Sequence, residues 1–304
     1  MRFSLPLRLP FRLRADSVAA QLLRHGWYVA PPPLFVAEAY KRLLESDPFA
    51  DILEVTTAAG LTAVPVDMRN SQLIAADRES FPDGYEPDVA AAMELLLPDD
   101  GVFIDAGANW GCFALLAALR PGFQGRVVAI EPAPRPAADL AALIAALDLP
   151  VRALRLALGE VDGTAQLSQP LMTGGASLVE PGAGTPVEVR RLDGLDLPPP
   201  NLIKLDVEGA ELAALRGAAG VLARHRPAIV MECRTDTPGG HWAAPLHLLA
   251  GHGYSIFAMD AQADHAAGRC ALNLTPMTPT GRDAFPLHLN ILAVADLALL
   301  EARP

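Results

Sequence analysis

The segment from Gly101 to Pro132 constrains the fold of this chain more than any other stretch. It reads G-V-F-I-D-A-G-A-N-W-G-C-F-A-L-L-A-A-L-R-P-G-F-Q-G-R-V-V-A-I-E-P. Two short apolar runs each end on an acid, and a turn of small residues and a longer apolar stretch lie between them. This order predicts strand, loop, helix and strand. A unit of this kind is the first half of a doubly wound α/β sheet, whose ligands bind at the carboxyl ends of the strands.

The residue types in this loop indicate a ribose-bearing cofactor. Gly107 and Gly111 let the backbone turn sharply and approach a ligand. Glu131 follows at the distance where such folds place a carboxylate on the ribose hydroxyls. Asn109 replaces the middle glycine of the dinucleotide pattern G-x-G-x-x-G, which disfavours a pyrophosphate. The acid at Asp105 favours a cofactor with an ammonium or sulfonium group, and S-adenosylmethionine carries both.

Three motifs make the resemblance specific. The strings D-A-G-A-N-W-G at 105–111, I-E-P at 130–132 and I-K-L-D-V-E-G-A-E at 203–211 resemble the FkbM family of S-adenosylmethionine-dependent methyltransferases. The resemblance implies an α/β, class I (Rossmann-like) fold with a mostly parallel seven-stranded sheet and an antiparallel last strand. It also implies that 105–111 and Glu131 hold the cofactor. The family's usual reaction is O-methylation of a hydroxyl on a sugar, glycan or polyketide-like acceptor.

Acids also end the later strands. Asp206 follows the apolar run 202–205, and Glu232 follows the run 228–231. In the strand order 3-2-1-4-5, Asp206 should face the same crevice as Asp105. The acids expected to act in catalysis are Asp206, Glu208 and Glu232, with His241 as a weaker candidate for the base. The same acids could hold magnesium, although we expect no metal.

Lys204 and Glu86 are two further charged residues to place. Lys204 lies inside an apolar strand, where an unpaired ammonium is costly, so we expect it to pair with a carboxylate. Glu86 opens a helix expected from Pro87 to Leu97, and it serves either the helix dipole or, by the resemblance, the rim of the cofactor pocket.

Ala157 and Leu158 follow a strand expected at 151–156, and they either lie against an adenine ring or form a plain turn. The full set of expected cofactor-binding residues is Glu86, Asp105, Gly107, Ala108, Asn109, Gly111, Glu131, Pro132, Ala157, Leu158 and Asp206.

The remaining segments predict an N-terminal elaboration over residues 1–80, before a methyltransferase domain at 81–304. Helix-like stretches at 16–23 and 34–44 suggest a cap or a homodimer arm, and the pattern at 52–76 predicts a hairpin. The arginine-rich first fourteen residues suggest either a basic arm for membrane or partner contact or a frayed or edge-strand terminus, and we expect such a terminus. The stretch from Met172 to Ser177 is either a lid over the active site or a surface loop.

Composition limits the partners. The 24 basic and 35 acidic residues give a net charge of -11, which argues against nucleic acid and leaves a small-molecule or glycan acceptor. The three cysteines have no metal-ligand spacing, so we expect a reducing, cytoplasmic location. We expect neither a signal peptide nor a transmembrane segment, because no apolar run is long enough.

Two other functions stay open from the sequence. One is a nicotinamide-dependent oxidoreductase, which the missing glycine disfavours. The other is a non-catalytic, cofactor-binding partner subunit.

Overall fold

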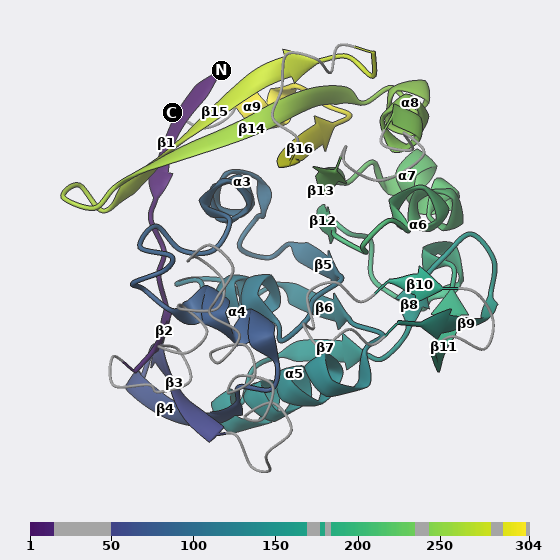
Figure 1. Cartoon of the computed structure of the whole chain (residues 1–304). Coiled ribbons are helices and arrows are strands. Elements are labelled where there is room, and N and C mark those ends of the chain that lie inside the picture. Colours follow the sequence, from purple (N-terminus) through teal and green to yellow (C-terminus); the bar gives the residue numbers. More distant parts are fainter. Residues whose placement is uncertain (15–49, 169–176, 180–183, 235–242, 281–287, 302–304) are drawn as a thin grey trace, which may run out of the picture.

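A computed structural model describes residues 1–14, 50–168, 177–179, 184–234, 243–280 and 288–301. Over these ranges the protein is a mixed α/β structure with one large mixed sheet and two smaller sheets (Figure 1). The helices expected at 16–23 and 34–44, residues 172–176 of the expected lid, and His241 lie outside the described residues.

The centre of the large sheet is the parallel arrangement that the sequence predicts. Its parallel neighbours run in the order β13-β12-β5-β6-β7. These are β5 (Val102–Ala106), β6 (Arg126–Ile130), β7 (Val151–Leu154), β12 (Leu202–Leu205) and β13 (Ala228–Arg234). Every residue of β5 and β12 is buried, as expected for strands covered on both faces. The carboxyl ends of these strands therefore meet at one edge.

The sheet has nine strands in the described part of the chain, rather than the seven expected. The last strand, β16 (His288–Val294), lies between β13 and β14 (Ser255–Asp264) and is antiparallel to both. The additional strands are β15 (Arg269–Met277), which forms a hairpin with β14, and β1 (Arg2–Pro6), which pairs with β15. The N-terminus is thus an edge strand, one of the two alternatives for this segment.

Helices cover both faces of the sheet. On one face pack α3 (Pro87–Leu96), α4 (Cys112–Ala118) and α5 (Pro134–Leu147). On the other pack α6 (Glu211–Gly217), α7 (Ala219–His225) and α8 (Ala243–Gly251). Successive side chains of one strand enter different cores, because side chains alternate across a sheet. Phe103 belongs to the first core and Ile104 to the second.

Two small sheets flank this body. One contains β2 (Phe11–Leu13), β3 (Ala50–Thr57) and β4 (Gly60–Asp67), so the expected hairpin is present as β3 and β4. The other contains β8 (Ala157–Leu158), β9 (Gly163–Leu167), β10 (Leu178–Val179) and β11 (Thr185–Arg190). The remaining short elements are η1 (Ser71–Ala76), η3 (Leu192–Gly194) and α9 (Ala298–Glu301).

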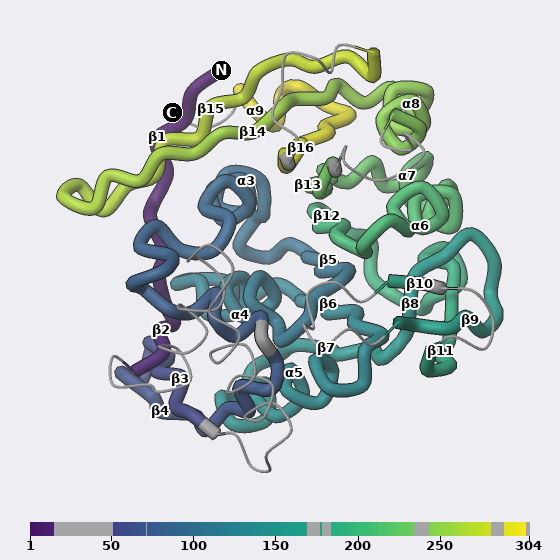
Figure 2. Tube along the Cα trace, in the orientation of Figure 1, coloured from purple at the N-terminus to yellow at the C-terminus, as the bar shows by residue number. Residues whose placement is uncertain are grey.

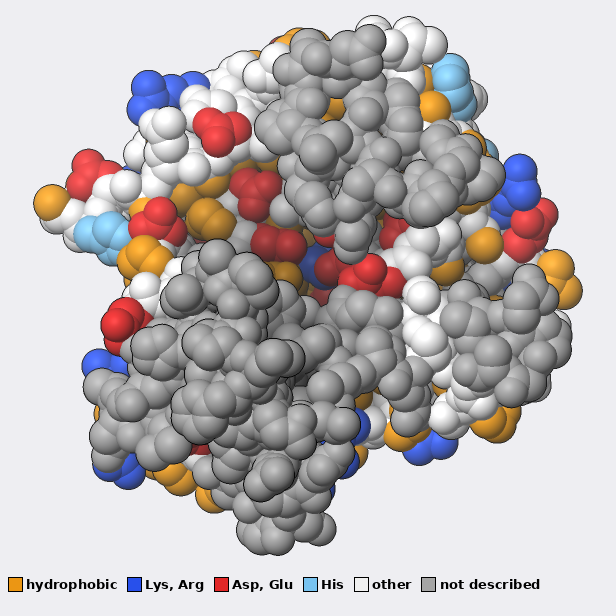
Figure 3. Space-filling model, viewed as in Figure 1, with side chains coloured by type: hydrophobic (Ala, Val, Ile, Leu, Met, Phe, Trp, Pro, Cys, Tyr) orange, Lys and Arg blue, Asp and Glu red, His pale blue; other side chains and the backbone are white. Residues whose placement is uncertain are grey.

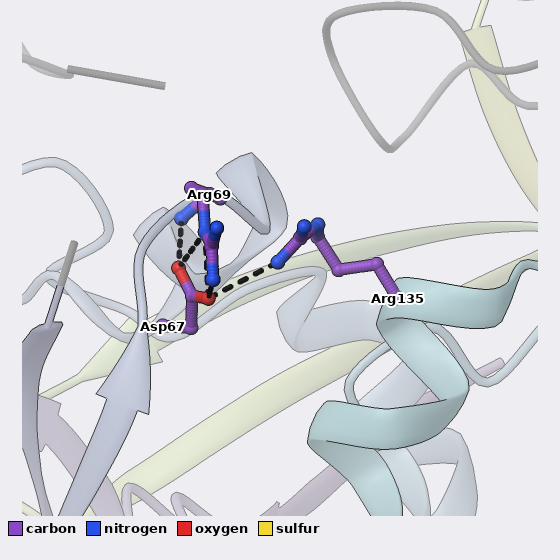
Figure 4. Close-up of polar contacts among 3 residues, drawn as sticks. All are labelled: Asp67, Arg69 and Arg135. Carbon is purple, nitrogen blue, oxygen red and sulfur yellow. Dashed lines mark hydrogen bonds and ion pairs between the residues drawn. The ribbon is translucent and has the colours of Figure 1, made fainter. Parts of the chain in front are cut away.

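The N-terminal segment connects two sheets. Figure 2 shows the first residues, in purple, running from the edge of the large sheet to the three-stranded sheet. A polar contact also joins the three-stranded sheet to α5: Asp67 at the end of β4 accepts hydrogen bonds from Arg69 and from Arg135, the latter at 3.0 Å (Figure 4). The domain division at residue 80 stays a prediction, although β1 pairs within the large sheet.

Candidate functional site

A cleft lies at the carboxyl ends of the parallel strands. Its empty volume is about 1020 Å³, with the open solvent at its mouth included. Acidic side chains gather around a basic one in the middle of this face (Figure 3). The loops after β5, β6 and β12, strand β8 and the residues just before α3 form much of its wall. This is the place where a doubly wound sheet binds its ligand.

The loop after β5 is held tightly against its neighbours. The N–H groups of Gly107 and Ala108 both donate to the carbonyl oxygen of Ile130, at 2.9 and 3.0 Å. Gly107 has a φ of +80°, and a Cβ atom there would overlap the backbone carbonyl oxygen of Asp206. Glycine at this position therefore allows the loops after β5 and β12 to lie side by side in the cleft.

Gly111 supports the loop from behind. It has a φ of +96° just before α4, and a Cβ atom there would overlap the side chain of Leu140 on α5. It does not line the cleft. The expected direct contact of Gly111 with a cofactor therefore has no support in the geometry, and its place indicates packing of α4 against α5.

Glu131 lies in the wall with both carboxylate oxygens engaged. Oε2 accepts a hydrogen bond from the N–H of Asn109, and Oε1 accepts one from the N–H of Ala133, each at 2.8 Å. Burial raises the pKa of Glu131 to about 7, against the lowering effect of these two donors. Each carboxylate oxygen still has a lone pair for a ligand hydroxyl.

Asp105 lies beneath the cleft. Its side chain is fully buried and does not line the wall. Oδ2 accepts a hydrogen bond from the N–H of Ala114 at 2.9 Å, and Oδ1 has no hydrogen-bond partner within the described residues. Burial raises the pKa of Asp105 to about 6, against the charge of Lys204. Asp105 thus anchors the start of α4 and places negative charge behind the wall.

Lys204 pairs with a carboxylate, as its place in an apolar strand predicts. Its Nζ is 3.0 Å from Oδ2 of Asp206 and 4.9 Å from the centroid of the Phe113 ring. Burial alone would lower the pKa of Lys204, but the carboxylates of Asp206, Asp105 and Glu86 outweigh it and raise the pKa. The ammonium is therefore charged at neutral pH.

Glu86 differs from the other acids of the wall. It has a φ of 44° at the start of α3, and its side chain makes no hydrogen bond to cap the helix. Its Oε2 atom is buried and has no hydrogen-bond partner in the described chain. Burial raises the pKa of Glu86 to about 8, with Lys204 opposing and Asp206, Asp88 and Glu232 adding to the rise.

Glu211 fixes the loop that carries Asp206 and Glu208. Its Oε1 atom accepts hydrogen bonds from the N–H groups of Val207 and Gly209, at 3.2 and 3.1 Å. Glu208 and Gly209 both have positive φ values, 51° and 96°, so the turn is sharp. Glu211 belongs to the 203–211 motif but was not among the expected site residues. In the structure it shapes the wall.

Most of the predicted residues meet in the cleft wall. These are Glu86, Gly107, Ala108, Asn109, Glu131, Pro132, Ala157, Leu158, Asp206, Glu208 and Glu232. Asp105 and Gly111 lie behind it. Sequence reasoning did not name Gln72, Tyr85, Cys112 and Phe113 as wall residues, and it included Trp110 only as part of the range 105–111. The residues of 105–111 and their neighbours offered a signal for Trp110 and Cys112, since they stand within or beside the motif, but Gln72 and Tyr85 come from segments without one.

The described residues contain no cluster of three or more metal-ligating side chains. None of the helices that the structure describes is long and apolar enough to cross a membrane.

The sequence matches the family model of the methyltransferase FkbM domain over residues 105–256, half of the chain. No curated protein matches the sequence.

Several solved structures are similar. One is a methyltransferase FkbM from Methylobacillus flagellatus KT, with 18% identity and a TM-score of 0.41 over 78% of this chain. The match covers 58% of that protein, less than two thirds of its length. An S-adenosylmethionine-dependent O-methyltransferase from Thermotoga maritima has 12% identity and a TM-score of 0.38, over 86% of this chain and 82% of that one. A precorrin-6y C5,15-methyltransferase from Geobacter metallireducens GS-15 has 16% identity and a TM-score of 0.39, over 69% and 89%.

Proposed function

This chain belongs to the FkbM methyltransferase family, and we propose that it transfers the methyl group of S-adenosylmethionine to a hydroxyl oxygen of a small-molecule or glycan acceptor. The observation that carries the proposal is the convergence of the Gly107 loop, Glu131 and Asp206 on one cleft. A sugar, glycan or polyketide-like acceptor is the class that the family resemblance implies.

The cleft fits S-adenosylmethionine in its chemistry. Leu156, Ala157 and Leu158 give one part of the wall an apolar surface suited to an adenine ring. Glu131 has free lone pairs for the ribose hydroxyls. The unpartnered, buried oxygen of Glu86 suits a positively charged group. Asp105 contributes only through its charge and through α4.

The chain's own residues would align the reactants and receive a proton. S-adenosylmethionine, when bound, supplies an electrophilic methyl group. Asp206, held at 3.0 Å by Lys204, is our first candidate to take or steer the proton of the acceptor hydroxyl. Glu208 and Glu232 also line the wall and are the alternative candidates. The packed loops around Gly107 would fix the geometry of the transfer.

The first test identifies the ligand. A mass spectrum of small molecules released from the purified protein should contain S-adenosylmethionine or S-adenosylhomocysteine, and calorimetry should measure saturable binding of both. Release of a nicotinamide dinucleotide would favour an oxidoreductase. Cofactor binding without methyl transfer to any fraction of a glycan and small-molecule extract would favour the non-catalytic alternative.

The second test separates binding from chemistry. Asp206→Asn keeps the shape of the side chain but cannot accept the proton, so turnover should fall by about 10² to 10⁴ while cofactor affinity is largely retained. A folded Asp206→Asn enzyme with normal turnover would assign the proton to Glu208 or Glu232 instead.

A further inference from the structure

Glu86 combines three properties that no other acid of the described cleft shows together. It lines the wall, its Oε2 atom is buried, and that oxygen has no hydrogen-bond partner among the described residues. The other buried acids are partnered by the chain itself: Glu131 by two backbone N–H groups and Asp105 by one. An unpartnered buried carboxyl group is costly when ionised, unless a ligand supplies a positive charge.

The groups that face Glu86 make its ionisation still more costly. Lys204 of β12 is the only cation in the described wall, and it already pairs with Asp206. The other titratable groups around Glu86 are Asp88 on α3, Asp206 after β12, Glu232 on β13, Cys112 on α4 and the adjacent Tyr85. The carboxyl groups of Asp88, Asp206 and Glu232 therefore outnumber the single ammonium. The raised pKa of Glu86, about 8, agrees with this imbalance.

We propose that Glu86 is a neutral carboxylic acid in the free protein and gives up its proton when a cationic group of the cofactor binds beside it. The inference rests on the proposed function, because it takes S-adenosylmethionine as the ligand. The proton leaves the Glu86 carboxyl for solvent, and the resulting carboxylate forms an ion pair with the ligand. No other bond forms or breaks.

The consequence is selection by charge. S-adenosylmethionine carries a sulfonium and an ammonium group, S-adenosylhomocysteine has lost the sulfonium, and 5′-methylthioadenosine has neither. A cleft with surplus carboxylates and one paired lysine holds the most positively charged of the three best. With the sulfonium beside it, Glu86 would favour the methyl donor over the demethylated product and so assist product release. With the ammonium beside it, Glu86 would favour both ligands over 5′-methylthioadenosine.

The test is calorimetry at pH 6.5 in buffers of different ionisation enthalpy, with these three ligands. At this pH an ordinary α-amino group, whose pKa is about 7.7 to 8.0, is protonated in solution, so proton release reports on the protein. Binding of S-adenosylmethionine should release about one proton. The neutral 5′-methylthioadenosine keeps the ribose and adenine, so it subtracts any contribution from Glu131.

S-adenosylhomocysteine identifies the cation. Proton release with both S-adenosylmethionine and S-adenosylhomocysteine would place the ammonium at Glu86, and release with the first alone would place the sulfonium there. Either result supports the proposal. Equal proton release with all three ligands would overturn it, as would binding of S-adenosylmethionine with no release.

Two variants and a control complete the experiment. Glu86→Gln resembles the neutral acid, so it should fold normally, bind without proton release and lose the roughly five- to tenfold rise in affinity that the wild type shows between pH 6 and 7. Glu86→Asp keeps a titrating carboxyl and should retain part of the release. Glu160→Gln, an exposed acid outside the wall that pairs with Arg216, should behave as wild type.

Unchanged proton release in folded Glu86→Gln would assign the proton to another group and overturn the proposal. Failure of the wild type to bind any of the three ligands would instead overturn the proposed function. The two failures are therefore distinguishable.

Discussion

Two ion-pair groups of the molecule have opposite charge balances. At the outer contact, two arginines, Arg69 and Arg135, serve one carboxylate, Asp67 (Figure 4). In the described part of the cleft, the single lysine, Lys204, lies among several carboxyl groups. Burial alone would raise the pKa of Asp67, yet the hydrogen bonds and charge of Arg69 and the charge of Arg135 lower it. In the cleft, burial prevails and raises the pKa values of Glu86, Asp105 and Glu131.

The difference separates a contact that holds elements together from one prepared for a ligand. The ionised carboxylate of the outer group, Asp67, has two arginine partners within the chain. Among the described residues of the cleft, carboxyl groups outnumber the single lysine. Their ionised forms are therefore costly unless a proton or a cation is added. A charge surplus within buried walls is therefore evidence of a missing positive group.

Removing Lys204 should have the largest effect. Lys204→Met leaves the buried carboxylates without their cation, so the free energy of unfolding should fall by about 3 to 5 kcal/mol at pH 8. Acids with raised pKa values are more fully protonated at pH 6 than at pH 8, and a protonated acid does not need a cation. The loss of stability should therefore be smaller at pH 6. Urea denaturation at both pH values measures it. A loss that is equal at pH 6 and pH 8 would show that packing, not charge, makes Lys204 necessary.

Displacing the loop after β5 should rank second. Gly107→Ala places a Cβ atom against the carbonyl of Asp206 and forces alanine to a φ of +80°, so we expect a loss of about 2 to 4 kcal/mol in stability. Cofactor affinity should fall with it. Gly163→Ala is the matched control, because nothing lies near its added Cβ and its φ is not in the left-handed region. Similar melting curves for the two variants would contradict the close approach of the two loops.

The sequence predicted the parts of the fold and site that depend on local pattern. Apolar runs ending on acids placed β5, β6 and β12 correctly, and the motifs placed Glu131 and Asp206 in one cleft. The pairing of strands that are distant in the sequence was harder to predict. The hairpin partner β15 contains a proline and several polar residues, which weaken its strand signal.

The differences between the expected and the observed wall residues have one physical cause. Sequence shows which residue ends a strand, but not whether its side chain enters the cleft or the layer beneath. Asp105 is the penultimate residue of β5 and is fully buried, whereas Asp206 follows the end of β12 and lines the wall. Tyr85 enters the wall because α3 docks on the sheet, which is a tertiary contact without local signal.

Neutralising Glu131 should moderately weaken the binding of the cofactor. Glu131→Gln keeps the size of the side chain but loses one acceptor for the N–H groups of Asn109 and Ala133 and the charge for the ribose. A charge-assisted hydrogen bond contributes about 1.5 to 3 kcal/mol, so affinity for S-adenosylmethionine should fall roughly tenfold to a hundredfold. Calorimetry at pH 8, above the pKa of about 7, measures it. Wild-type affinity would remove Glu131 from the cofactor site.

Opening the outer contact should have the smallest effect. Arg135→Ala removes one of two partners of Asp67, the Arg135 side chain is 41% exposed, and exposed pairs contribute about 0.2 to 1 kcal/mol. Because the pKa of Asp67 is lowered, its stabilisation is present above the unfolded pKa and is lost as pH falls through the folded pKa. The small loss seen by urea denaturation at pH 7 should therefore shrink at pH 3 and in high salt. Arg155→Ala, at an exposed arginine beyond β7, is the control for loss of a surface charge. A loss above 2 kcal/mol would mean that the outer contact is as essential to the fold as the cleft lysine, and the contrast between the two groups would fail.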